Sequence, residues 1–372
     1  MVAPLALVLA FSLPPHVRIA PEQQRVPMRV AADGTIAATV TDASGMPRIL
    51  TWNHERRPRL ISPSAHLDPG ELSASLELGG FDGTGIIYAT LVKSMELEAG
   101  GNQTLPGVYP SGAFVPLDLK RCSAIAPSDF LPHVERVAGD VVYLTYESPD
   151  STEVLDGDQT SDFAPYAVRL DGSSCVLLGR ASIRDVSGDY VVGFRGYLGT
   201  FIAPTDFDTD SQRYVAVRIH QGSLTELGPG VAMAVAADGT AVGADAPPGF
   251  HQTTSTTVNG RTSTTSCCTP HAMLWRVDGT LIALAPNARS SVAYAVDDDG
   301  TVGGMLIDAA GKHRAFVWRN GTLRLLDDAV HAPGWRFEAV FAFGLHHEIL
   351  GVGTHNGTAM VFEVSRVFRR LK

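Results

Sequence analysis

The chain has 372 residues and a formal net charge of −10, with 37 glycines, 23 prolines and only 18% charged residues. This length exceeds what one ordinary core supports, so we expect several domains or a repeat architecture, and the many turn formers favour an all-β fold. The acidic charge argues against nucleic acid as a partner, because phosphate binding depends on Lys and Arg. No apolar run beyond the N-terminus is long enough to span a bilayer.

The first 24 residues predict an N-terminal segment separate from a single folded domain, residues 25–372. Residues 1–13 have the apolar length of a signal-peptide core, but they lack a basic region before it and a clear cleavage motif after it. The alternative is an ordinary buried strand, and residues 16–20 are a further candidate strand for the last repeat. From this segment we expect a secreted or periplasmic protein.

A pattern of four apolar strands joined by polar turns recurs along the rest of the chain about every 50 residues. Both faces of its first strands are apolar or small, so each sheet must be covered on both sides, as happens when copies stack around an axis. We predict an all-β, seven-bladed β-propeller of four-stranded antiparallel blades with almost no helix; six or eight blades are the alternatives. The predicted blades are residues 25–63, 72–127, 133–179, 181–229, 231–286, 291–328 and 338–371.

Blade two departs most from the pattern. An enlarged segment at residues 96–110 separates its second strand from a third strand expected at 112–119 and a fourth at 120–126. In blade seven we expect residues 367–371 to form the fourth strand.

Blade six gives the clearest pattern. Asp299-Gly300 and Asn320-Gly321 are two-residue turns between apolar runs, the strongest short signal of a β-hairpin. Trp318 ends the third strand of this blade as Trp275 does in blade five. We therefore expect both indoles at equivalent, buried positions between blades.

Blades five and six also carry a family resemblance. Their third strands read His-Ala-Met-Leu-Trp (271–275) and Arg-Ala-Phe-Val-Trp (314–318), and Gly-Thr-Leu follows each of them. This pattern resembles the HAF repeat of bacterial extracellular proteins, with a partial match in blades four and seven and a faint one in the first three. The resemblance implies an extracellular propeller and brings no catalytic residues with it.

Four long insertions separate second from third strands in blades two to five, and they are residues 93–111, 147–164, 195–212 and 245–270. Loops of one kind in neighbouring blades emerge on one face, and loops longer than a dozen residues are usually functional or disordered. We therefore expect ligand binding at the loop-rich face of blades two to five. The last insertion is rich in Thr and Ser, and we expect it to be mobile.

The insertions of blades three and four carry alternating carboxylates, which are ligands suited to calcium. The candidates are Asp156, Asp158, Asp162, Asp206, Asp208 and Asp210. The glycine and the late glutamate of a full calcium loop are missing, so a solvated acidic loop is the alternative. We expect no other cofactor.

Four cysteines form an even but sparse set. Cys122 and Cys175 fall in corresponding regions of neighbouring blades, where a disulfide requires Cα atoms within about 7 Å although outer strands diverge. Cys267 and Cys268 are adjacent, and they form either a strained vicinal disulfide, separate bonds or free thiols.

The first strands, which line the axis of a propeller, differ between the two halves of the ring. Blades five to seven have Met233, Tyr294 and Phe341, whereas blades one to four have charged side chains. Those charged residues are Arg29, Glu77, Glu135, Arg136, Arg184 and Asp185. Charges are rarely buried unless paired, so they form either structural ion pairs or a binding site for a polar ligand. Five histidines are interpreted as structural: His271, His313, His346, His347 and His355.

Together these observations favour a secreted, monomeric, non-enzymatic propeller that binds a protein or glycan. The alternative is a propeller lyase or hydrolase acting on a polysaccharide or another polar substrate, which rests on fold analogy alone.

Overall fold

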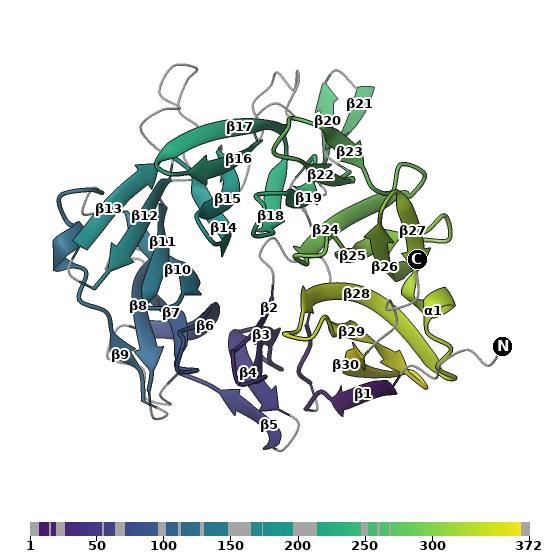
Figure 1. The fold of residues 1–372 in the computed structure, drawn as a ribbon, viewed down its shortest axis with the longest axis horizontal. Helices are drawn as coiled ribbons and strands as arrows, with labels where there is room; N and C mark the ends of the chain where they lie inside the picture. The colour runs from purple at the N-terminus through teal and green to yellow at the C-terminus, as the bar shows by residue number, and fades with distance from the viewer. Residues whose placement is uncertain are drawn as a thin grey trace.

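The chain forms a seven-bladed β-propeller in which each blade is a four-stranded antiparallel sheet (Figure 1). This confirms the predicted fold class and the blade number. The structure is a computed structural model, and it describes residues 7–14, 16–19, 27–53, 56–63, 71–95, 102–110, 113–126, 130–147, 165–172, 174–195, 214–246, 252–258, 261–267 and 269–365.

The first three blades each run from an inner strand to an outer strand in chain order. Blade one comprises β2 (Met28–Val30), β3 (Ile36–Thr41), β4 (Pro47–Asn53) and β5 (Arg56–Ile61). Blade two comprises β6 (Glu71–Phe81), β7 (Ile87–Met95), β8 (Asn102–Tyr109) and β9 (Val115–Pro116). Blade three comprises β10 (Leu131–Ala138), β11 (Val141–Glu147), β12 (Tyr166–Asp171) and β13 (Ser174–Gly179).

The next three blades repeat this order. Blade four comprises β14 (Ser182–Ser187), β15 (Tyr190–Arg195), β16 (Val215–His220) and β17 (Ser223–Pro229). Blade five comprises β18 (Val231–Val235), β19 (Ala241–Ala244), β22 (Ala272–Trp275) and β23 (Leu281–Ala283). Blade six comprises β24 (Ser290–Val296), β25 (Val302–Ile307), β26 (His313–Arg319) and β27 (Thr322–Leu325), followed by the short helix α1 (Leu326–Ala329).

Blade seven joins the two ends of the chain. Its inner strands are β28 (Trp335–Phe343), β29 (Ile349–His355) and β30 (Thr358–Ser365), and its outer strand is β1 (Leu7–Ser12), which pairs antiparallel with β30 (Figure 1). The expected outer strand at residues 367–371 lies outside the described residues. The apolar run at the N-terminus thus forms a strand in the fold. The other candidate segment is residues 16–20. Its Arg18 forms a β-bridge with Thr41 of blade one, so this segment does not add a strand to the last blade.

The turns have the chemistry that the sequence predicts. In blade six the Asp299 carboxylate accepts a hydrogen bond from the Thr301 amide at 2.9 Å, and Gly300 between them has a φ of 79°. An aspartate that holds its own turn and a glycine free of Cβ strain fix the reversal locally. The hairpin therefore closes without help from other blades.

The two predicted tryptophans occupy equivalent positions. Trp275 pairs with Ala241 on the second strand of blade five, and Trp318 pairs with Val302 on that of blade six. Their exposed fractions are 3% and 6%. This prediction is confirmed, because each indole packs into an apolar cluster between neighbouring blades.

The strands expected in blade two were wrong. The expected loop of blade two contains its true third strand, β8, and residues 120–126 hold a 3₁₀ turn, η2 (Lys120–Cys122), instead of a fourth strand. β8 begins with polar residues and has a proline near its centre, and this pattern is more typical of a loop than of a strand. The Thr-rich insertion of blade five forms a hairpin of β20 (Gln252–Val258) and β21 (Arg261–Cys267). Its many β-branched residues favour strands, and its mobility stays a prediction.

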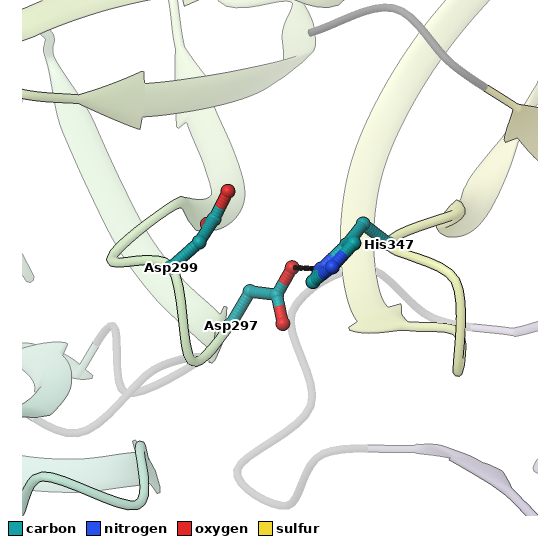
Figure 2. A group of neighbouring side chains, drawn as sticks. All are labelled: Asp297, Asp299 and His347. Atoms are coloured by element: carbon teal, nitrogen blue, oxygen red, sulfur yellow. Dashed lines mark hydrogen bonds and ion pairs between the residues drawn. The ribbon is translucent and has the colours of Figure 1, made fainter. Parts of the chain in front are cut away.

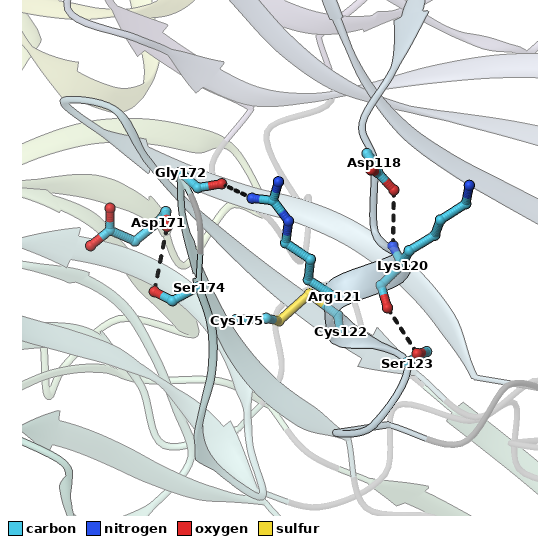
Figure 3. Close-up of a disulfide and its surroundings, with 9 residues drawn as sticks. All are labelled: Asp118, Lys120, Arg121, Cys122, Ser123, Asp171, Gly172, Ser174 and Cys175. Carbon is cyan, nitrogen blue, oxygen red and sulfur yellow. Dashed lines mark hydrogen bonds between the residues drawn. A yellow bond between two sulfur atoms is a disulfide. The ribbon is translucent and has the colours of Figure 1, made fainter.

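A disulfide joins Cys122 and Cys175 across the boundary between blades two and three (Figure 3). Their Cα atoms lie 5.3 Å apart, because Cys122 sits in η2, a turn that crosses over β13, and not in a diverging outer strand. Next to it, the Arg121 guanidinium donates a hydrogen bond to the Gly172 carbonyl (Figure 3). The Cys267 side chain and all of Cys268 lie outside the described part of the chain.

Among the described residues, no helix is both long enough and apolar enough to cross a membrane.

Candidate functional site

The first strands of blades two to seven share a β-bulge, at which one residue has no partner on the second strand. Such an extra residue bends the strand and redirects its side chain. The bulged residues are Gly79, Glu135, Arg184, Met233, Tyr294 and Phe341. Counting back from its Asp-Gly turn places Met28 at the same position in blade one. The character of the axis is therefore set by one residue from each blade.

One half of the axis is apolar. Met28, Met233, Tyr294 and Phe341 are at most 1% exposed and belong to one hydrophobic cluster. The rings of Tyr294 and Phe341 meet edge to face, with centroids 5.0 Å apart. Large apolar side chains and rings therefore fill this half.

The other half is charged. Arg184 and Glu135 form an ion pair of 3.3 Å between blades four and three, and both are at least 96% buried. Arg184 also donates to the Ile183 carbonyl and lies over the Phe194 ring. Burying such a pair costs a large desolvation energy, which the attraction of the partners only offsets with good geometry. At these positions an ion pair therefore contributes less to stability than the Met or Phe side chains that other blades have there.

In blades three and four the residue that follows the bulged one is charged as well. Here Arg136 of blade three and Asp185 of blade four form an ion pair of 2.9 Å, and the second Asp185 oxygen accepts the Val235 amide of blade five. The equivalent residue of blade one is Arg29. The other blades have small residues at this position, which are Gly80, Ala234, Ala295 and Ala342.

Arg29 extends from blade one to blade four. It is 8% exposed, and its Nη atoms donate to the Met28 carbonyl at 3.2 Å and to the Arg184 carbonyl at 3.4 Å. Its buried Nε has no hydrogen-bond partner among the residues that the structure describes. Burial, followed by the positive charge of Arg136, lowers the pKa of Arg29 to about 9. The guanidinium is thus buried with its charge poorly compensated.

A second polar group lies two residues before the bulges. His133 of blade three is 8% exposed and stands between two carboxylates, with Nδ1 3.3 Å from Glu77 and Nε2 4.0 Å from Glu147. Glu77 therefore pairs with a histidine from the next blade. An imidazole held between carboxylates is suited to moving protons.

The sequence predicts six charged candidates on the first strands, but it does not show which of them pair. Five of its six candidates meet at the axis: Arg29, Glu135, Arg136, Arg184 and Asp185. All six calcium candidates, from Asp156 to Asp210, lie outside the described residues.

A group that the sequence interpretation missed lies on the turns of blades six and seven (Figure 2). His347 Nδ1 is 2.5 Å from an Asp297 oxygen, and ligand atoms of Asp297, Asp299 and His347 lie within 4.8 Å of one another. This hydrogen bond raises the pKa of His347. Asp299 is also paired with Arg319 at 3.0 Å. The turns between first and second strands of adjacent blades are neighbours in a propeller. Applied to blades six and seven, this rule predicts that Asp297, Asp299 and His347 lie close together.

No family model matches the sequence, and no curated protein matches it. Among solved structures, the acylaminoacyl peptidase of Pyrococcus horikoshii is 11% identical with a TM-score of 0.46, over 98% of this chain and 54% of the peptidase. The β-propeller domain of the Trilobed protease from Pyrococcus furiosus is 9% identical with a TM-score of 0.44, over 98% of this chain and 95% of that domain. A fucose-specific lectin from Aleuria aurantia is 10% identical with a TM-score of 0.38, over 80% of this chain and 92% of the lectin. This chain spans about half the length of the first peptidase.

Proposed function

We propose that the chain is a secreted or periplasmic, non-enzymatic binding propeller that holds a polar ligand at the charged half of its axis. The ligand enters from the loop-rich face of blades two to five. The observation that carries this proposal is the division of the axis, in which Glu135 and Arg184 occupy bulge positions that hold Met, Tyr or Phe in blades five to seven and Gly79 in blade two. A ring that needed only stability would favour apolar residues at all of them.

Two observations support an oxidising location. The first is the Cys122–Cys175 disulfide. Disulfides persist in secreted and periplasmic proteins, whereas the thiols of cytosolic proteins are kept reduced. The resemblance of blades five and six to the HAF repeat of extracellular proteins points the same way. We further propose that the protein is a monomer, that it binds a protein or glycan and no nucleic acid, and that calcium binds, if anywhere, at the acidic insertions.

The Glu77–His133–Glu147 group favours one alternative function. A buried histidine between two carboxylates has the components of general acid–base catalysis, as a polysaccharide lyase or hydrolase requires. The binding role ranks first because it rests on the division of the whole axis, whereas the enzymatic role rests on this histidine group alone.

A glycan and peptide binding array tests the proposal. We expect wild-type protein to bind a defined set of polar ligands, and the Arg136→Gln variant to lose at least 10-fold in affinity, because one charged contact is worth about 1.5–3 kcal/mol. Arg319→Gln is the matched control, since it removes an ion pair of similar length from the third strand of blade six, away from the axis.

Retention of full affinity by Arg136→Gln would refute the site. Release of saccharide products by wild type, but not by His133→Asn, would instead establish the enzymatic alternative. Repeating the array with a chelator tests calcium.

A further inference from the structure

Arg29 differs from the other charged residues at the axis. Glu135 pairs with Arg184, and Arg136 pairs with Asp185, whereas no carboxylate of the described residues lies within ion-pair distance of Arg29. Within the described part of the chain, its acceptors are two backbone carbonyls, and its Nε has no acceptor. A buried polar atom without a partner normally has a structural or functional reason.

The charges at this level do not balance. Among the described residues at this level, three guanidinium groups, from Arg29, Arg136 and Arg184, face two carboxylates, from Glu135 and Asp185, which leaves one positive charge in this part of the chain. Arginine stays protonated at neutral pH, so it cannot relieve the cost of burial by losing its proton. One bound negative charge would neutralise the group.

We propose that Arg29 binds the carboxylate of a small organic acid at the propeller axis. This inference rests on the proposed binding function and names the chemistry of the ligand. The free Nε–H and one Nη–H form a fork that matches the two oxygens of a carboxylate. The second contact is available because the bond from Nη2 to the Arg184 carbonyl is long, at 3.4 Å.

The charge and the burial of the site limit the charge and the size of the ligand. A carboxylate supplies the single negative charge that is missing, whereas a phosphate group carries about −1.5 to −2 and would leave the site negative. Arg29 is only 8% exposed, so the acid must be small enough to enter the axis, and a polymer reaches it only through a terminal group.

Thermal unfolding with sodium acetate as the probe tests this inference, with sodium chloride used to keep the ionic strength constant. We expect saturable stabilisation of wild type, by about 3 °C at 100 times the dissociation constant. Inorganic phosphate should give less than half that shift. Arg29→Met should unfold at the same or a higher temperature than wild type without acetate, since it removes an unpaired buried charge, and should show no acetate shift.

Arg218→Met is the matched control. Arg218 is equally buried, at 8% exposed, and donates to the Gly239 carbonyl, but it lies on β16 away from the axis. It should keep the acetate shift. Because Arg29→Met replaces a buried residue, wild-type protein provides a second measurement: acetate should move the ¹⁵N signal of the Arg29 Nε–H.

An equal acetate shift in wild type and Arg29→Met, or an unmoved Nε–H signal at saturating acetate, would overturn the inference. These results are separable from failure of the proposed function. If array ligands still depend on Arg136 while acetate has no effect, only the carboxylate inference fails.

Discussion

Removing the Cys122–Cys175 disulfide should destabilise the propeller without changing its fold. The two cysteines are 53 residues apart, and the bond closes a loop that contains most of blade three. Chain-entropy reasoning for a loop of this length gives about 4 kcal/mol at 25 °C. With an unfolding entropy of about 2.1 cal/mol/K per residue, that corresponds to a fall in Tm of about 5 °C.

The assay is urea unfolding of wild type and of the Cys122→Ala, Cys175→Ala double variant, with and without reductant. We expect wild type to lose about 4 kcal/mol on reduction and the double variant to lose nothing further. Two apolar replacements keep the Cys122 site filled, since that residue is 1% exposed among apolar neighbours. Equal stability of oxidised wild type and the double variant would refute the reasoning.

Three further predictions concern the axis and the turns. Glu135→Gln should lower the free energy of unfolding by about 3–5 kcal/mol because it leaves Arg184 charged and buried, whereas replacing both residues by Met should cost far less; equal urea midpoints for the two variants would contradict this. NMR titration should give His347 a pKa above 6.5 that Asp297→Asn returns to normal, so the bond stabilises the fold below pH 6.5 and is lost as the pH rises through the folded pKa; an unchanged titration would rule out the interaction. Gly304→Ala should cost about 1–3 kcal/mol in thermal or urea unfolding, because the added Cβ would lie 2.2 Å from the Val292 carbonyl oxygen; wild-type stability would show that the strand can shift.

The blades with local turn signals were predicted well from the sequence. In blade six, Asp299-Gly300 and Asn320-Gly321 define their hairpins without reference to distant residues. The closing strand could not be assigned in this way. Leu7 pairs with Ser365 at the other end of the chain, and an apolar N-terminal run has the same composition in a signal peptide and in a buried strand.

The site shows the same division between local and distant information. The charged first strands are visible in the sequence, because Arg136 and Asp185 interrupt apolar runs. Their pairing depends on bulges that align neighbouring blades, and a bulge has no clear sequence signal. The contact of Asp297 with His347 joins turns 50 residues apart and depends on the stacking of whole blades.

The most direct test of the binding site is a crystal structure of the protein soaked with the strongest ligand from the array. We expect density for that ligand at the charged half of the axis, within hydrogen-bond distance of Arg29 or Arg136. A fully occupied ligand bound only on the outer strands or on the turns of blades five to seven, with the axis unchanged, would contradict it.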